Sequence, residues 1–230
     1  WTQRAHVLAD HAVSGVLGHV SSLHFDTMSE LLWVGSASGQ LTSHTGALPT
    51  LPRYTSLAAH GVPKQPRHVR GILSDDKFII SLSEGRVCAS QRQGLGRWSM
   101  QIEDHAPGVA LAGLCASPQS ASSDIIVGGA APNSHDALFA LHSISGRVVR
   151  SAVSDGTVTQ LRKGSRYLCV GTEQGTIQLH DPRSLRAEHK LPAHHGGLID
   201  LQTDGHLIYS IGWTLRQGRR ITEPESYTHL

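Results

Sequence analysis

One short phrase recurs along this chain of 230 residues. It consists of an apolar strand that ends in Gly or Ser, a polar turn that contains Gly, and a second strand of alternating character. It occurs at residues 31–41, returns at 78–87 and returns again at 167–177. The spacing from Gly35 in the first copy to Gly171 in the last equals three units of about 45 residues. Such a period constrains the fold strongly, because each copy has to form the same structural unit.

A unit of about 40–45 residues with several short strands is typical of one blade of a WD40 β-propeller. The pairs Ala59-His60 and Ala193-His194 each precede a new apolar run and keep nearly the same spacing. The sequence therefore predicts an all-β, WD40-like β-propeller of about four and a half blades. It is either a complete small propeller with a degenerate last blade or part of a larger ring. We favour the second, because an unclosed ring exposes a strand edge.

The predicted domain limits follow from where the alternation begins and ends. Residues 20–218 form the partial propeller, residues 1–19 are an N-terminal extension or a closing strand, and residues 219–230 are an irregular tail. The expected strands are residues 22–25, 31–36, 40–44 and 53–57; 69–73, 78–82, 86–90 and 98–100; 113–116, 124–129 and 137–141; 159–161, 167–171 and 176–181; and 197–201 and 207–212.

The composition limits the class of protein. With 39% apolar and 17% charged residues the chain is too apolar for general disorder, and a net charge of +2 gives no basic footprint for nucleic acid. The first twenty residues hold no sustained apolar stretch, and the longest apolar run, 109–116, is too short to cross a bilayer. We therefore expect a soluble, intracellular protein without a signal peptide.

No pattern of residues predicts catalysis, a cofactor or a metal site. The three cysteines have no paired spacing, so buried reduced thiols are favoured over a metal or disulfide role. The sixteen histidines lack ligand spacing, and adjacent side chains on a strand point to opposite faces. His60 and His194 fall where one blade passes into the next, so a structural role is favoured over a ligand role. Asp181 is the nearest equivalent of the Trp-Asp pair.

Basic and aromatic residues supply the only candidates for partner binding. Arg92 and Arg97 cluster with Arg86 in the second blade, and Arg216 and Arg219 cluster with Arg220 after the fifth. Such clusters bind phosphate or an acidic partner, although an ordinary solvated surface is the commoner explanation. Trp213, beside the second cluster, is the best candidate for an exposed aromatic residue.

Several phrases resemble the N-terminal WD region of the catalytic subunit of the poly(A)-nuclease (PAN) deadenylation complex, especially the fungal type. They follow in the same order and comprise residues 31–35 with 38–43, 53–56 with 59–60, 89–95 with Trp98, 165–169, and 210–218. The last phrase is the most specific for that family. The chain departs from the family after it, since residues 223–230 replace a strand that ends near Tyr-Asp-Leu-Arg.

The resemblance implies a non-catalytic scaffold in mRNA poly(A)-tail shortening. In that family the propeller has seven blades and precedes a linker, an inactive ubiquitin-hydrolase-like domain and a magnesium-dependent exonuclease domain. The chain contains neither later domain, so the resemblance implies no catalytic residues and no cofactor here. It implies two partners, a homodimer of the kinase-like regulatory subunit and the poly(A) ribonucleoprotein with its poly(A)-binding protein, the latter through direct or indirect contact. It also implies a cytoplasmic location that includes P-bodies.

Two other functions fit the sequence less well. A stand-alone peptide-binding WD40 adaptor, unrelated to deadenylation, has the same period but does not explain the phrases. An enzyme in its own right would need a nucleophile, metal or phosphate motif. The phrase Gly35-Ser36-Ala37-Ser38-Gly39 is no nucleophile elbow, because Ala37 stands where that motif needs Ser.

Overall fold

The computed structural model describes most of the chain from residue 19 to residue 228. The described residues are 19–45, 53–58, 61–62, 65–66, 68–92, 96–116, 124–130, 137–204, 206–216 and 219–228, and for 53–66, 96–97, 215–216 and 225–228 the backbone alone. Nearly all regular structure in this part is β-strand, with one turn of 3-10 helix at Ile102–Asp104. The chain divides into two compact units, Trp1–Gln101 and Ile102–Leu230.

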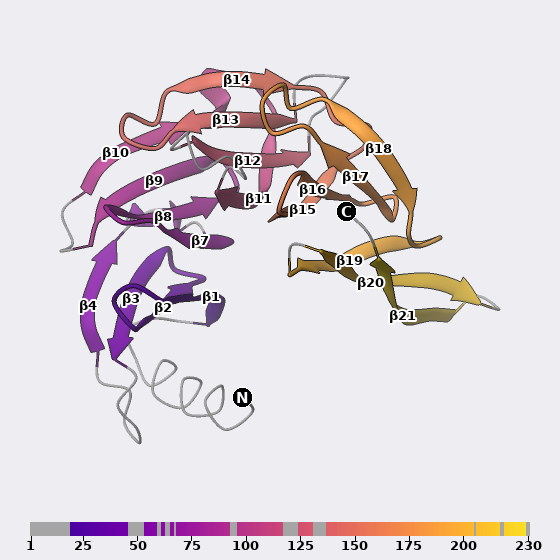
Figure 1. The fold of residues 1–230 in the computed structure, drawn as a ribbon. Helices are drawn as coiled ribbons and strands as arrows, with labels where there is room; N and C mark the ends of the chain where they lie inside the picture. The colour runs from indigo at the N-terminus through magenta and orange to yellow at the C-terminus, as the bar shows by residue number, and fades with distance from the viewer. Residues whose placement is uncertain are drawn as a thin grey trace. The chain divides into compact units, whose positions relative to one another are not determined.

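The N-terminal unit contains two four-stranded antiparallel sheets built from consecutive strands (Figure 1). The first sheet has the order β1-β2-β3-β4 and the second has the order β10-β9-β8-β7. A two-residue ladder, β5 (Gly61–Val62) with β6 (Gln65–Pro66), lies between them in sequence. The bounds are β1 (Val20–Asp26), β2 (Leu31–Ser36), β3 (Gln40–Thr45), β4 (Arg53–Ala58), β7 (Gly71–Ser74), β8 (Phe78–Ser83), β9 (Arg86–Gln91) and β10 (Gly96–Gln101).

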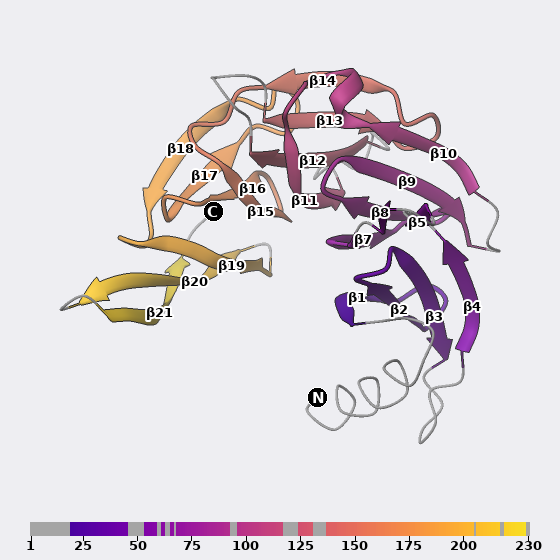
Figure 2. The same cartoon turned by 180° about the vertical axis from the view of Figure 1, so that it is seen from behind.

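The C-terminal unit contains three more sheets with the same consecutive order, as both views show (Figure 1, Figure 2). The third sheet is β11-β12-β13-β14, the fourth is β15-β16-β17-β18, and the fifth has three described strands, β19-β20-β21. The bounds are β11 (Ala110–Ala116), β12 (Asp124–Ala130), β13 (Leu138–His142), β14 (Val148–Ala152), β15 (Val158–Lys163), β16 (Leu168–Thr172), β17 (Thr176–His180), β18 (Ala187–Pro192), β19 (Gly197–Thr203), β20 (Leu207–Arg216) and β21 (Arg219–Thr228).

The glycine that ends the recurring apolar strand is required by close packing. A Cβ atom on Gly35 would lie 2.6 Å from Cγ1 of Val69, which precedes the second sheet. A Cβ atom on Gly171 would lie 2.8 Å from Cδ2 of Leu198 in the fifth sheet. At both glycines the register with the preceding strand shifts, which is a β-bulge. The repeated Gly is therefore the point where one sheet admits a side chain of the next.

The second glycine of the phrase is required by the backbone of the turn. Gly39 and Gly175 have φ angles of 83° and 81°, a conformation that costs a residue with a Cβ atom appreciable free energy. The carbonyl of Gly175 also accepts hydrogen bonds from the N–H groups of Ala193 and His194, which ties this hairpin to the start of the following sheet.

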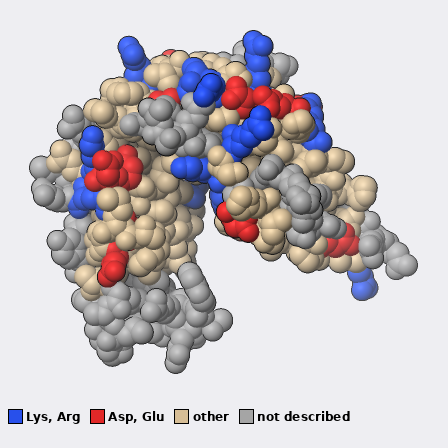
Figure 3. Space-filling model, in the orientation of Figure 1, with Lys and Arg blue, Asp and Glu red and all other residues tan. Residues whose placement is uncertain are grey.

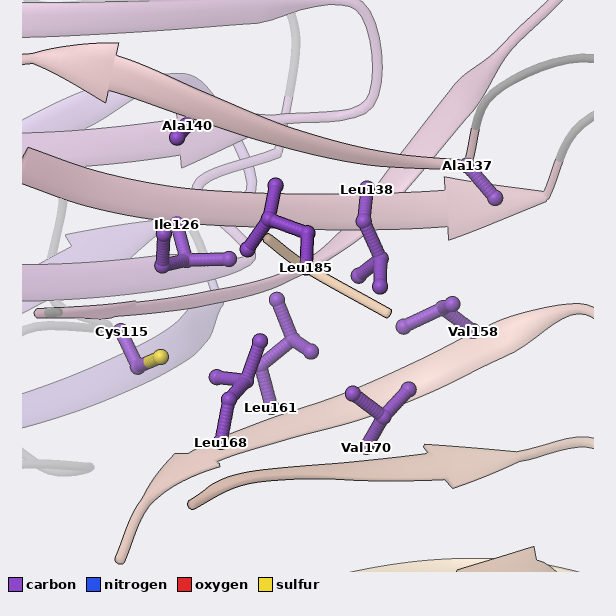
Figure 4. Packing of buried hydrophobic residues seen from close by; sticks show 10 residues of the cluster. All are labelled: Cys115, Ile126, Ala137, Leu138, Ala140, Val158, Leu161, Leu168, Val170 and Leu185. Carbon is purple, nitrogen blue, oxygen red and sulfur yellow. The ribbon is translucent and has the colours of Figure 1, made fainter. Parts of the chain in front are cut away.

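Apolar side chains from facing sheets form the core. In the cluster of Figure 4, Ile126 and Leu138 of the third sheet meet Leu161 and Val170 of the fourth, and Leu185 lies between the two sheets. A second cluster joins the fourth and fifth sheets through Cys169, Ile177, Leu179, Leu198, Leu201 and Ile208. In the C-terminal unit, the fourth sheet thus covers the apolar face of the third, and the fifth covers that of the fourth.

The structure corrects the predicted domain limits at the C-terminal end. Residues 219–230 were expected to form an irregular tail, but β21 occupies Arg219–Thr228 and pairs with β20 over its whole length. The expectation is wrong because residues 219–228 continue a long hairpin with β20. The backbone hydrogen bonds of a hairpin form without the alternation of apolar and polar residues from which strands were predicted. The expected extension or closing strand at 1–19 lies almost wholly outside the described residues.

Among the described residues, no helix is long and apolar enough to cross a membrane.

Candidate interaction sites

Arg92, a predicted partner-binding residue, is engaged inside the N-terminal unit. Its guanidinium pairs with Asp26 at the end of β1, and one bond, from Nη2 to Oδ1, spans 3.2 Å. Its Nε donates to the carbonyl of Asp75 over 3.1 Å. One side chain thus links the first sheet to the turn before β8. The partner-binding role of Arg92 stays a prediction, and the geometry supports a structural role instead.

Asp26 shows how strongly that link is fixed. Its side chain is 1% exposed. Burial alone would raise the pKa of the carboxyl group, but hydrogen bonds from Arg92, Ser29 and the N–H of Met28 lower it to about 2. Asp26 is therefore ionised at neutral pH, and removing Arg92 would leave its charge buried without a counterion.

Trp213 is half-buried. Its ring lies against Gly196 and Gly197, where added Cβ atoms would clash with the indole. The guanidinium carbon of Arg220 lies over the ring, 4.5 Å from its centroid. A partner that approaches Trp213 therefore also meets the guanidinium of Arg220. The sequence placed Arg220 in the cluster but could not show this stacking, because β21 was not expected.

The other predicted partner-binding residues lie on the strands that the structure describes. Arg219 is exposed and pairs with Arg216 at the end of the β20–β21 hairpin. The side chains of Arg216 and of Arg97, in β10, lie outside the described part of the structure. On the face drawn in Figure 3, basic and acidic side chains are interspersed. The partner-binding roles of these arginines stay predictions.

The geometry supports the structural roles expected for His194 and Asp181. The buried His194 shares a hydrogen bond of 2.9 Å between Nε2 and Oγ of Ser210, and its ring lies against Gly212. Asp181 accepts hydrogen bonds of 3.1 Å from the N–H groups of Arg183 and Ser184. The bond from Arg183 is the main reason that the pKa of Asp181 is lowered. His60 lies outside the described residues, so its role stays a prediction.

A polar groove that no sequence motif indicated lies on the fourth sheet. It has a volume of about 450 Å³ and is formed by the β15–β16 turn, the β17–β18 turn and β18. Arg166 and Tyr167 contribute from the first turn, Asp181 and Arg183 from the second, and Glu188 from β18. The two parts of the groove, at Arg166–Tyr167 and at Asp181–Glu188, are separated in the sequence by β16 and β17, so no local pattern predicted that they meet.

Within the described part of the chain, no group of three or more His, Cys, Asp or Glu residues is placed to hold a metal ion. Burial raises the pKa of the Cys115 thiol to about 12 and those of Cys88 and Cys169 to about 11. All three cysteines are buried and form no disulfide, and their raised pKa values give no nucleophilic thiolate at neutral pH.

Comparison with known proteins agrees with the repeat and the sheets. The PAN2 N-terminal family model matches residues 6–222. The PAN2-PAN3 deadenylation complex catalytic subunit of Schizosaccharomyces pombe is 31% identical over 206 residues, which are 89% of this chain and 17% of the relative. The corresponding subunit of Aspergillus oryzae is 32% identical over 89% of this chain and 16% of its own length. This chain thus spans about a sixth of these relatives.

Solved structures give the same result. The Pan2 WD40 domain of Neurospora crassa matches with a TM-score of 0.76 and 25% identity, over 92% of this chain and 63% of that one. A chain of the mitotic checkpoint complex matches with a TM-score of 0.67 at 16% identity, which shows the fold alone. The prediction of a partial, all-β WD40 propeller is confirmed, and the nuclease domain of the relatives lies outside the matched region.

The matched residues run from the N-terminal segment to the β20–β21 hairpin and include every sheet described above, so this chain belongs to the PAN2 N-terminal family.

Proposed function

We propose that this chain is a non-catalytic scaffold in a cytoplasmic deadenylase. In this role it binds the kinase-like regulatory subunit, as a homodimer, and helps to present poly(A) ribonucleoprotein to a nuclease domain located elsewhere. It acts in the cytoplasm, including P-bodies. The observation that carries the proposal is the family match over residues 6–222, together with relatives that are named as subunits of a PAN2-PAN3 complex.

The architecture is suited to such a role. Within each unit, the connecting turns and outer strands of the sheets offer binding surfaces without needing a catalytic centre. The described residues hold no metal cluster and no activated thiol, so the chemistry of the site favours binding over catalysis.

The test is co-expression of this chain with the kinase-like subunit from the same source, followed by affinity capture through a tag on the chain. Stoichiometric retention of the subunit is the expected result. Loss of the subunit, with the chain shown to be folded by circular dichroism, would contradict the proposal. Capture of unrelated proteins alone would instead favour the stand-alone peptide-binding adaptor.

A matched variant identifies the surface involved. Arg219→Glu reverses an exposed charge at the end of the β20–β21 hairpin, whereas Arg70→Glu reverses an exposed charge in the N-terminal unit. If the hairpin contacts the subunit, the first variant weakens capture and the second does not.

A further inference from the structure

The polar groove on the fourth sheet combines three recognition elements in one place. They are the guanidinium of Arg166 over the Tyr167 ring, the exposed guanidinium of Arg183, and the carboxylate of Glu188. We propose that this groove binds one nucleotide of a single-stranded RNA with a preference for bases that carry an exocyclic amino group. The proposal rests on the proposed function only for the choice of RNA as the ligand.

The first element is a platform for a base. The guanidinium carbon of Arg166 lies 5.4 Å from the centroid of the Tyr167 ring. Tyr167 is itself held edge-on by His189, with ring centroids 5.8 Å apart. Arg166 is exposed, so a base can approach its guanidinium from the solvent. A guanidinium plane held in this way stacks on nucleobases.

The second element is a cation on the β17–β18 turn. Arg183 is exposed and lines the groove, and its charge helps to lower the pKa of the neighbouring Asp181 carboxyl group. The turn that carries Arg183 is rigid, because Arg150 donates to the Arg183 carbonyl over 2.9 Å and Asp181 caps the N–H groups. Leu185 holds the turn in the core at 0% exposure despite a φ angle of 57°. A preorganised arginine loses less entropy when it binds a phosphate.

The third element selects the base. Glu188 is exposed at the groove, and among the described residues its carboxylate accepts no hydrogen bond. Asp181 is already satisfied by the turn, so Glu188 is the free acceptor. Carboxylates accept hydrogen bonds from the amino groups of bases, as they do from cytosine N4. Adenine and cytosine fit this arrangement, whereas uracil presents a carbonyl oxygen that the carboxylate would repel.

An acidic or phosphorylated peptide matches fewer of these elements. Its anion would pair with Arg183 as an RNA phosphate would, but it brings neither a nucleobase face for Arg166 nor an exocyclic amino group for Glu188. The lining is mostly polar, and Tyr167 and Pro182 are its least polar members. A nucleotide instead offers an anion for Arg183, a π-face for Arg166 and a donor for Glu188. The volume of about 450 Å³ is within the range of small-molecule sites.

The test is fluorescence anisotropy of the whole chain with short labelled oligoadenylate, oligocytidylate and oligouridylate at low salt. We expect tighter binding of the first two RNAs. Arg166→Ala and Arg183→Ala should each weaken oligoadenylate binding about tenfold, the scale of a lost stacking or phosphate contact. Arg183→Ala should also reduce the slope of log K against log salt by about 0.7. Arg147→Ala removes an exposed arginine outside the groove and should change neither value.

Two conservative variants separate the roles of the residues. Arg166→Lys keeps the charge but lacks the plane, so it should lose most of the affinity that Arg166→Ala loses. Glu188→Gln can both donate and accept, so it should narrow the difference between oligoadenylate and oligouridylate. Equal affinity of the unaltered chain for all three RNAs would overturn the proposal. A loss of oligoadenylate affinity in Arg147→Ala as large as the losses in Arg166→Ala and Arg183→Ala would also overturn it. Displacement of the RNA by an acidic peptide, with the same dependence on Arg166 and Arg183, would overturn it in favour of a peptide site.

The inference can fail without the proposed function failing. The same variants are therefore also captured with the kinase-like subunit, without RNA. Retention of the subunit by a chain that binds no RNA would refute the groove alone. Loss of the subunit by the unaltered, folded chain would refute the scaffold proposal.

Discussion

A single ion pair, Arg92 with Asp26, connects two parts of the N-terminal unit. Arg92→Met keeps the aliphatic stem but removes the counterion of a carboxylate that is 1% exposed. We expect this change to lower the free energy of unfolding by about 2 kcal/mol or more at pH 7. Urea denaturation followed by tryptophan fluorescence measures it. Arg70→Met, which breaks an exposed pair with Glu84, should cost about 0–1 kcal/mol.

The same pair predicts a pH dependence. The folded-state pKa of Asp26 is about 2, below its ordinary value of 3.8, so its stabilising contribution is complete above about pH 4. That contribution, about 2 kcal/mol, is lost as the pH falls from about 4 to about 2. Asp26→Asn should therefore lie well below the unaltered chain in stability at pH 6 and approach it near pH 2. A constant difference across this range would contradict the assignment.

At Gly212, adding a single Cβ atom tests how tightly the surrounding side chains pack. A Cβ atom there would collide with the ring of His194, which is buried and bonded to Ser210. Gly212→Ala should therefore destabilise the chain by about 1–3 kcal/mol, the usual cost of overpacking. The thermal unfolding temperature reports it. The double variant Gly212→Ala with His194→Ala should recover part of the loss if the collision is the cause, and no recovery would argue against it.

Side-chain roles were harder to predict from the sequence than backbone positions. His194 was expected to have a structural role, and it is buried and shares a hydrogen bond with Ser210 of β20. The clustering of Arg92 with Arg86 and Arg97 suggested an open basic surface, but Asp26 lies 66 positions away and no local pattern links the two. For the same reason the sequence could not reveal that Arg220 covers Trp213.

Among the strands, the recurring phrase was the most reliable guide. β2, β8 and β16 lie where the phrase predicted them, because buried central strands need apolar residues on both faces. β14 and β18 were not predicted, since both are outer strands with largely exposed or half-buried side chains. β21 was missed for a related reason: much of it is exposed and it contains Pro224, which is tolerated at a sheet edge.

The fifth sheet has one open face. Tyr209 and Ile211 of β20 are each 43% exposed, whereas Ile208, on the opposite face, is buried against the fourth sheet. In the third and fourth sheets the corresponding face is covered by the next sheet. We expect this apolar face to cause association of the isolated chain as its concentration rises.

Ile211→Lys should lower that association without lowering stability, as measured by light scattering after gel filtration. Ile144→Lys is the control, because Ile144 is also exposed, at 40%, but lies in the β13–β14 turn. Equal effects of the two substitutions would show that the open face is not responsible.

Across the whole chain, three buried thiols provide a probe of global opening. Because burial raises the pKa of Cys88, Cys115 and Cys169 to about 11 or 12, few thiolates exist at pH 8. We expect none of the three to react with Ellman's reagent within minutes in the native protein, and all three to react in urea. The urea concentration at the midpoint of thiol reactivity should equal that at the midpoint of the fluorescence transition. Fast native reaction of one thiol would show that its sheet opens locally.

The consecutive order of strands in every sheet also bears on how the chain reaches its native state. Each sheet is completed within a short stretch of sequence, and the core clusters of the C-terminal unit join sheets that follow one another. Contacts of this kind need only short loops to close, so little entropy is lost before they form. A sheet can therefore assemble soon after its last strand leaves the ribosome and can serve as a template for the sheet translated next.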